Sequence, residues 1–398
     1  MDAQQTPVRI LHLSDFHFSV GRHWDADPIL RELAAFIGQD IAGNGLTPDL
    51  VVITGDLAQS GKPEEYDLAR TWLENQLWPR LADPNHPLPR DRLLLVPGNH
   101  DVDWARIGPA AKDAHQVILK AKHQDAVTDR LRHDATRQLL IERHAAYQAF
   151  HGDWLGQPQP LPWWQRSLTI QGQRLHIAGL DSAWLAARDD DSRLVIGTYQ
   201  INQTALHRDA DADHDWRIAL LHHPWDSLAE LDRTEAKRTL HRRRDLILRG
   251  HLHEPDPVRL VPPDPKRSCV ELAAGCCYSG KSYPNAFQWI ELYGSPRRLR
   301  VLFRQWNRHD WDVDRNQPGC PDGTWTLDLD EAGQNAPATF GPAGSMPNAT
   351  ARTSSALPIW QEKLDYLRVQ QAICSDPAQK FTLRKLIEEA EAKLRDLD

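Results

Sequence analysis

Residues 93–101 read LLLVPGNHD, an apolar run that ends on Asn99, His100 and Asp101. A short apolar run bounded by Gly or Pro predicts a buried strand. Side chains that bind cations or carry protons therefore stand directly at the end of a predicted strand. Ligands of open α/β sheets bind at the carboxyl ends of the strands. This stretch predicts an α/β fold with a functional site at one edge of a sheet.

Five further runs have the same character, at residues 8–13, 50–53, 175–180, 218–221 and 246–248. Helical patterns separate the early runs, at 29–41 and 64–77. Alternating strands and helices predict an α/β core. Four of the five runs end directly on a motif that contains Asp or His. The remaining run ends on Asp181 and Ser182, which we interpret as packing or supporting residues.

The predicted core is interrupted once and then completed. Residues 104–164 are polar, charged and prone to form helices, so we expect a helical insertion that shapes access to the site. Runs at 270–274, 287–292 and 299–303 predict short strands that close the sheets. These observations predict one domain over residues 1–305.

The remaining chain differs in composition. Residues 306–357 are rich in Gly, Pro, Ala, Ser, Thr and Asn, which predicts a flexible linker because such a stretch buries little apolar area. Beyond it, apolar residues recur at helical spacing, and Asp376 before Pro377 is a helix start signal. Residues 358–398 are therefore predicted to form a two-helix hairpin. Two short helices have too little core to be stable alone, so we expect a partner or the chain's own domain to cover them.

Composition narrows the class of protein. The net charge of −8 argues against a whole-protein footprint for nucleic acid or an anionic membrane. No apolar run approaches the roughly 20 residues of a membrane helix, and the first residues do not resemble a signal peptide. The five cysteines show no Cys-x-x-Cys spacing, which favours reduced, buried thiols. We expect a cytoplasmic protein without a membrane segment.

Candidate metal ligands gather at the predicted strand ends. Asp15 and His17 are two residues apart, so their side chains emerge on the same face of a strand. Asp56 has two carboxylate oxygens, which can bridge two cations. His222 and His223 are adjacent, and neighbouring strand residues point to opposite faces, so only one of them should be a ligand.

Together these motifs form an ordered set. They are Asp15-Phe16-His17, Gly55-Asp56, Gly98-Asn99-His100-Asp101, His222-His223-Pro224 and Gly250-His251-Leu252-His253. The set resembles the signature of the calcineurin-like metallophosphoesterase superfamily and covers residues 8–303. The resemblance implies a four-layered α/β/β/α sandwich with a dinuclear metal site at one edge.

The resemblance also implies a role for each motif residue. The first metal would be held by Asp15, His17, Asp56 and His253. The second metal would be held by Asp56, Asn99, His222 and His251. His100 would be the catalytic histidine and Asp101 its orienting partner. The His-x-Pro spacing of the family favours His222 over His223. Ligands of N and O fit Mn, Fe, Zn, Co or Ni, of which we favour Mn or an Fe/Mn pair.

The expected function is metal-dependent phosphoester hydrolysis. Two divalent cations hold phosphate oxygens and activate water, so an acidic protein can still bind a phosphoester. We expect a phosphodiesterase that acts on a nucleotide, cyclic nucleotide or nucleic acid. A phosphomonoesterase or protein phosphatase, or a scaffold that mainly binds, is the alternative. Residues 358–398 resemble effector-associated adaptor segments of bacterial conflict systems, which implies a protein partner.

Overall fold

The computed structural model describes residues 6–82, 86–121, 123–187, 193–262, 268–280 and 284–330, together with Arg368 and Ile387. The chain divides into two compact units, Met1–Gln334 and Asn335–Asp398. Of the second unit, only Arg368 and Ile387 are described, and each lies in a helix. The rest of the predicted hairpin, and the linker from residue 331 onward, lie outside the described residues.

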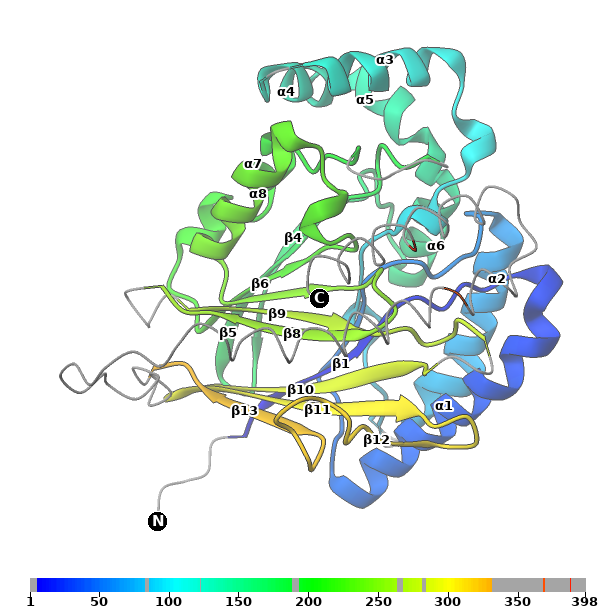
Figure 1. The fold of residues 1–398 in the computed structure, drawn as a ribbon, viewed down its shortest axis with the longest axis vertical. Coiled ribbons are helices and arrows are strands. Elements are labelled where there is room, and N and C mark those ends of the chain that lie inside the picture. The colour runs from blue at the N-terminus through cyan, green and yellow to red at the C-terminus, as the bar shows by residue number, and fades with distance from the viewer. Residues whose placement is uncertain are drawn as a thin grey trace. The chain divides into compact units, whose positions relative to one another are not determined.

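The described part of the first unit is built on two sheets (Figure 1). The first sheet contains β1 (Val8–Leu13), β2 (Leu50–Ile53), β3 (Leu93–Leu95), β10 (Ala286–Gly294), β11 (Arg297–Trp306), β12 (Trp311–Val313) and β13 (Thr324–Asp328). The second sheet contains β4 (Trp164–Ile170), β5 (Gln173–Gly179), β6 (Trp216–Leu220), β7 (Leu246–Arg249), β8 (Pro255–Leu260) and β9 (Cys269–Ala274). The strand orders are β12-β11-β10-β1-β2-β3, with β13 paired to β11, and β4-β5-β6-β7-β9-β8.

The strands at the centre of each sheet are parallel. β1 pairs with β2 and β2 with β3, while β5, β6, β7 and β9 pair in succession. A parallel strand is covered on both faces and therefore reads as a continuous apolar run. In β1, Val8 and Ile10 pack in the cluster between the two sheets, whereas Leu11 and Leu13 pack against helices.

Helices cover the outer face of each sheet. Figure 1 shows α1 (His23–Asn44) and α2 (Pro63–Trp72) on one side of the paired sheets, and α7 (Thr198–Gln203) and α8 (Glu230–Arg243) on the other. The first pair shares its core with the outer face of the first sheet, and the second pair with that of the second sheet. The predicted four-layered sandwich is confirmed. The predicted helix at 29–41 is part of α1, and a π turn, Leu73–Leu77, extends α2 across the predicted range 64–77.

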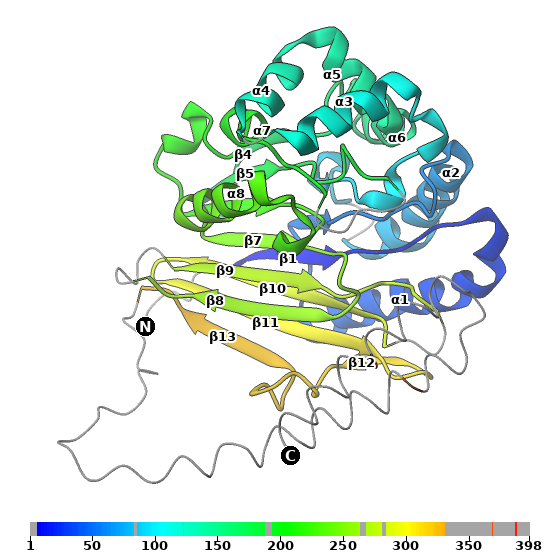
Figure 2. The same ribbon diagram turned by 45° about the horizontal axis from the view of Figure 1, so that its top comes forward.

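The insertion is helical, as predicted, but its helices belong to two packing groups. α3 (Pro109–Lys120), α4 (Asp125–Arg132) and α5 (Asp134–Ile141) lie together above α7 (Figure 2). They share a cluster in which Ile118 and Val127 pack with Trp184. α6 (Ala145–Leu155) instead packs on α2, where the rings of Phe150 and Tyr66 stack with centroids 5.4 Å apart. Among the described helices, none is long and apolar enough to cross a membrane.

The predicted domain end near residue 305 is wrong. β12 and β13 both pair with β11, so the first sheet continues through residue 328. Trp311 is buried, its ring lies 5.5 Å from that of Phe287, and its Nε1 donates a hydrogen bond to the carbonyl of Ile29 at 3.3 Å. Asn, Pro and Gly residues at 316–323 separate these short strands, and for that reason the composition resembles a linker.

Candidate metal centre

The seven predicted ligands lie at one edge of the two sheets. Each follows the carboxyl end of a strand that has a parallel neighbour. Asp15 and His17 follow β1, Asp56 follows β2, Asn99 follows β3, His222 follows β6, and His251 and His253 follow β7. Parallel strands end at the same edge of a sheet, so residues that are distant in sequence meet there.

Among the described residues, four overlapping groups have ligand atoms within 4.8 Å of one another. They are Asp15, Asp56 and His222; His17, Asp56 and His100; His222, His223 and His251; and His17, His253 and Cys276. His17, Asp56 and His222 each belong to two of these groups, and of the three only Asp56 has the two oxygens with which one side chain can bridge two cations. Asn99 adjoins them, because its Oδ1 lies 3.1 Å from Nε2 of His223.

The atoms that could bind a cation converge in three of these residues, Asp15, His17 and His253. The Nε2 atoms of His17 and His253 are 3.3 Å apart, and Oδ1 of Asp15 lies 3.3 Å from Nε2 of His253. Burial would raise the pKa of Asp15, but the hydrogen bond with His253 and the charge of His222 lower it, so the carboxyl is ionised. A buried carboxylate facing two imidazole nitrogens fits a divalent cation, which all three can bind at once.

His222 faces Asp56 in the same way. Its Nδ1 donates to the carbonyl of Thr54 at 2.6 Å, and its Nε2 lies 3.3 Å from Oδ2 of Asp56 without the geometry of a hydrogen bond. Burial opposes protonation, but Asp56 and Asp15 outweigh it and raise the pKa of His222 to about 9. The two buried carboxylates thus draw a proton onto His222, a positive charge that a bound cation would replace.

Both adjacent histidines face the site. β6 ends at Leu220, so the strand alternation that we used to choose between them does not apply. His223 contacts Oγ of Ser182 through Nδ1 at 2.8 Å and Oδ1 of Asn99 through Nε2 at 3.1 Å. Burial and the charges of His222 and His251 hold the pKa of His223 well below its usual value. This geometry favours His222 as the ligand and His223 as a support for Asn99.

Paired alanine variants distinguish the two histidines. His222→Ala is expected to lose one of two bound metals, because it removes a nitrogen that faces Asp56. His223→Ala is expected to keep both metals at saturation and to bind the second about 10- to 100-fold more weakly, the usual effect of removing a residue that orients a ligand. Elemental analysis and metal titration measure both quantities. The opposite pattern would make His223 the ligand.

The backbone at the site is strained. Positive φ angles occur at non-glycine residues, namely 55° at Asp15, 51° at His17, 52° at Asp56, 71° at His251 and 58° at His253. Such conformations cost about 1–3 kcal/mol each and cluster at functional sites. Backbone hydrogen bonds hold them, among them Asp15 N to Gly55 O at 3.0 Å and His17 N to Asp56 O at 3.0 Å.

Glycines in the motifs permit close approach of the chain. A Cβ atom on Gly98 would lie 2.7 Å from the backbone nitrogen of Asp56, and a Cβ on Gly250 would lie 2.7 Å from Oδ2 of Asp15. Real Cβ atoms do not approach other atoms this closely. The glycines therefore let the ligand loops pack together, which is a steric role separate from metal binding.

Gly98→Ala is expected to displace Asp56, to lower the free energy of unfolding by about 1–3 kcal/mol, and to reduce two-metal occupancy. Thermal unfolding in chelator and elemental analysis measure the two effects. Gly43→Ala is the control, because a Cβ on Gly43 meets nothing within 4 Å and this residue lies inside α1. Full metal occupancy in Gly98→Ala would contradict the steric role.

His100 lies in the 3₁₀ turn Asn99–Asp101. Its Nδ1 lies 2.8 Å from the carbonyl of Gln59, so Nδ1 carries the proton of that hydrogen bond and Nε2 is left for another partner. The ring of His100 has its centroid 4.8 Å from that of His17 and 6.2 Å from that of Trp104. This histidine is therefore beside the cation ligands and held by the main chain.

The prediction that Asp101 orients His100 is wrong. The Asp101 carboxylate accepts the backbone N–H groups of Ala58 and Gly98, both at 2.9 Å, and the hydroxyl of Tyr66 at 3.0 Å. Burial and the nearby charge of Asp56 raise the pKa of Asp101 to about 6. Successive side chains of a 3₁₀ turn point in different directions, so Asp101 joins two ligand loops while Gln59 holds His100.

Sequence reasoning missed Cys276 and Gln59 as neighbours of the site. Cys276 Sγ donates to the carbonyl of Asp15 at 3.2 Å, and burial raises the pKa of Cys276 well above its usual value, so it is a neutral thiol. The described cysteines are free and buried, as predicted. Ser182, interpreted as a supporting residue, does support His223.

A cavity of about 360 Å³ opens beside the metal groups. His17, His100 and His253 line it, together with Arg22, Trp24 and Asp25 at the start of α1 and with residues 278–280. Its described lining contains no residue of α3 to α6, so the prediction that the insertion shapes access is not supported at this entrance.

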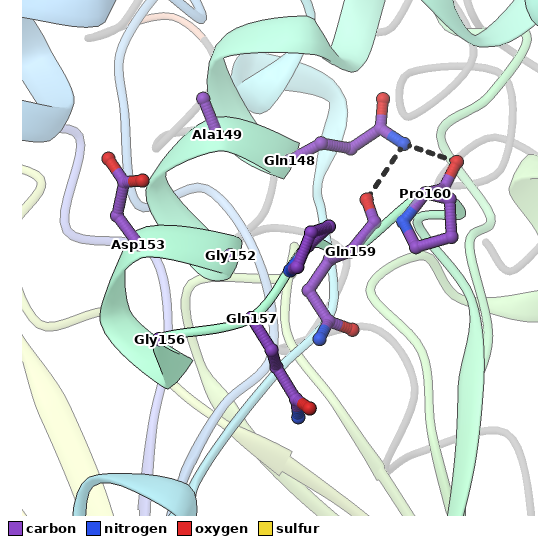
Figure 3. Close-up of a pocket in the computed structure, with 9 residues that line it drawn as sticks. Gln148, Ala149, Gly152, Asp153, Gly156, Gln157, Gln159 and Pro160 are labelled. Atoms are coloured by element: carbon purple, nitrogen blue, oxygen red, sulfur yellow. Dashed lines mark hydrogen bonds between the residues drawn. The ribbon is translucent and has the colours of Figure 1, made fainter.

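A second hollow, of about 650 Å³, lies between α6 and the turn that follows it (Figure 3). Gln148 Nε2 donates there to the carbonyls of Gln159 at 3.3 Å and Pro160 at 2.8 Å. Its titratable residue, Asp153, pairs with Arg70. This hollow contains none of the grouped metal ligands.

Comparisons with known proteins agree with the motifs. The profile of the family described as calcineurin-like phosphoesterase matches residues 8–255. A glycerophosphodiester phosphodiesterase of Enterobacter lignolyticus is 36% identical over 101 residues, which are 23% of this chain and 29% of the relative. A cAMP/cGMP dual specificity phosphodiesterase of Mycobacterium tuberculosis is 36% identical over 97 residues, 23% of this chain and 26% of the relative. The chain thus spans less than a third of each curated relative.

A purple acid phosphatase from seeds of Lupinus luteus superposes with a TM-score of 0.48 at 14% identity, over 86% of this chain and 58% of that one.

Proposed function

Since the chain belongs to the calcineurin-like phosphoesterase family, whose members are metal-dependent phosphoester hydrolases, we propose that its reaction is the hydrolysis of a phosphodiester. The convergence of Asp56 with histidines from four other loops at one sheet edge carries this proposal. The two curated relatives with partial similarity are both phosphodiesterases, which supports a diester over a monoester.

The residues present fit a dinuclear centre. We assign the first cation to Asp15, His17, Asp56 and His253, and the second to Asp56, Asn99, His222 and His251. These donors are nitrogen and oxygen atoms, so we favour Mn²⁺ or an Fe/Mn pair over cations that prefer thiolates.

The protein groups around this centre perform distinct tasks. When bound, the two cations supply Lewis acidity for the phosphoryl oxygens and an activated water for in-line attack. His100 would act as the proton donor: the carbonyl of Gln59 holds the proton on Nδ1, so a second proton, on Nε2 of the imidazolium form, is the one that would pass to the leaving oxygen. The 360 Å³ cavity accepts the ester group next to His17 and His253.

A substrate panel tests the proposal. With Mn²⁺ present, bis(p-nitrophenyl) phosphate is expected to be hydrolysed with a higher kcat/KM than p-nitrophenyl phosphate, and a chelator is expected to abolish both reactions. A preference for the monoester would make the protein a phosphomonoesterase. Two bound metals without hydrolysis of either ester would favour a binding scaffold.

Residues 358–398 are proposed to recruit a protein partner, which would bring the hydrolase to its substrate in a bacterial conflict or signalling system. Deleting residues 335–398, the second compact unit, is expected to leave kcat/KM for bis(p-nitrophenyl) phosphate within about twofold, because every proposed ligand lies in the first unit. Affinity capture with the full chain as reference measures partner binding. An equal loss of hydrolysis and capture would indicate instead that the segment stabilises its own domain.

A further inference from the structure

The cavity beside the metal groups has a feature that phosphoester chemistry does not require. We propose that Trp24 and Arg22 form a nucleoside subsite, so that the substrate is a small nucleotide phosphodiester whose base stacks on Trp24. This inference rests on the proposed phosphodiesterase function and deepens it. The proposed subsite identifies the group that is esterified to the scissile phosphate as a nucleoside.

The lining of the cavity combines two chemistries. His17, His100 and His253 line it together with Arg22 and Trp24. A phosphate held at the three histidines therefore has its ester group within the same 360 Å³ space as the indole of Trp24. That volume is at the lower end of the roughly 300–1,000 Å³ of small-molecule sites, so it suits a nucleotide better than a wide polymer surface.

The tryptophan that lines this cavity is exposed to solvent. Among the described residues, six large hydrophobic side chains are exposed, and Trp24 is the most exposed of them at 74%. Val20, exposed by 63%, lies four residues before it in the chain, and Leu252, exposed by 40%, stands between His251 and His253. Single exposed hydrophobic side chains are common on protein surfaces, so the indole of Trp24 is significant because it also lines the cavity of the histidines. Of these three side chains, only the indole offers a flat aromatic face.

The stacking residue is carried by an anchored helix end. α1 begins at His23, and Asp25 in its first turn accepts a hydrogen bond from the hydroxyl of Tyr278. Tyr278 also lines the cavity, on the segment that follows β9. This hydrogen bond joins the start of α1 to residues 278–280. A subsite on a restrained element loses less entropy when it binds a ligand than one on a mobile loop.

The positive charge of Arg22 beside Trp24 suits an anionic ester. Arg22 is exposed, lies two residues before Trp24 and lines the same cavity. A guanidinium group binds phosphate oxygens in pairs and also stacks on planar groups. Arg22 with Trp24 thus matches a ligand that joins an aromatic base to a phosphate, whereas a glycerol or simple alkyl ester has no planar group to stack on the indole.

Two chromogenic diesters with the same leaving group test the subsite. Thymidine 5′-(p-nitrophenyl phosphate) and ethyl p-nitrophenyl phosphate differ in the nucleoside. Wild-type protein with Mn²⁺ is expected to prefer the thymidine ester in kcat/KM. Trp24→Ala is expected to lower kcat/KM for that ester by about 5- to 100-fold, the range for loss of a base–aromatic stack, mainly through KM. The ethyl ester is expected to change less than about twofold, and Trp24→Phe is expected to restore most of the preference.

Matched variants control for surface effects. Arg22→Ala is expected to raise KM for the thymidine ester, whereas Arg31→Ala, an exposed arginine of the same helix paired with Asp27, is expected to leave it unchanged. Val261→Ala removes an exposed apolar side chain that does not line the cavity. Equal losses on both esters in Trp24→Ala, or no preference for thymidine in the wild type, would overturn the subsite.

A binding experiment separates this inference from the proposed function. Calorimetry with thymidine 5′-monophosphate and with inorganic phosphate, on the Mn²⁺-loaded full chain, is expected to show tighter binding of the nucleotide, with the difference lost in Trp24→Ala. If neither diester is hydrolysed but this difference is observed, the proposed reaction fails and the nucleoside subsite stands. If both diesters are hydrolysed without any difference in binding, the reaction stands and the subsite fails.

Discussion

Asp56→Ala is expected to bind no dinuclear metal pair and to lose phosphodiester hydrolysis by about 10³-fold or more, since a second cation contributes several kcal/mol of charge stabilisation in the transition state. The reason is geometric. Asp56 belongs to two of the ligand groups, and its Oδ2 faces His222 while its Oδ1 accepts the backbone N–H of His100 at 2.8 Å. Elemental analysis and kcat with saturating Mn²⁺ measure the loss.

A milder substitution tests whether loss of the bridging carboxylate, rather than loss of the fold, causes this defect. Asp56→Asn keeps the shape of the side chain and one carbonyl oxygen, so it is expected to retain one tightly bound cation and to remain folded by circular dichroism. Two metals bound at wild-type affinity in Asp56→Ala would refute the bridging assignment.

His100→Ala is expected to lower kcat by about 10²- to 10⁴-fold while both metals stay bound, because general acid catalysis contributes that much. His100 is held by Gln59 and is not one of the assigned ligands. The defect is expected to be larger for esters with alkyl leaving groups than for p-nitrophenyl esters, since p-nitrophenolate leaves without a proton.

The matched control is His309→Ala, because His309 is an exposed histidine remote in sequence from every ligand motif. Its kcat is expected to equal that of the wild type. If His100→Ala loses a metal, or if its defect is the same for alkyl and nitrophenyl leaving groups, His100 is a structural or ligand residue rather than the proton donor.

The central strands and the ligand motifs could be predicted because they share one physical cause. A strand buried on both faces must be apolar throughout, so its end stands out where Asp, Asn or His begins. β1, β2 and β7 were predicted in this way, and each is followed by ligand candidates. The edge strands β4 and β8 are half exposed, so they show no continuous apolar run and were missed.

Other features depended on contacts between residues distant in sequence. The residues that flank Trp311 in the sequence are polar, like those of a linker. Its ring nevertheless packs on Phe287, at the edge of the first sheet. Asp101 adjoins His100 in sequence, yet its carboxylate binds the amides of Ala58 and Gly98. The local sequence around Trp311 or Asp101 does not imply these contacts.

The sequence by itself determined the α/β core and the order of the ligand motifs, because apolar periodicity and motif spacing are local properties, and the resemblance of those motifs to a known family implied the four-layered fold. Tertiary structure decided that Gln59 holds His100, that both His222 and His223 face the site, and that Trp24 and Arg22 share a cavity with the histidines. These relations arise where loops from several strands meet at one edge. Their geometry depends on how the two sheets pack, which no short segment of the chain encodes.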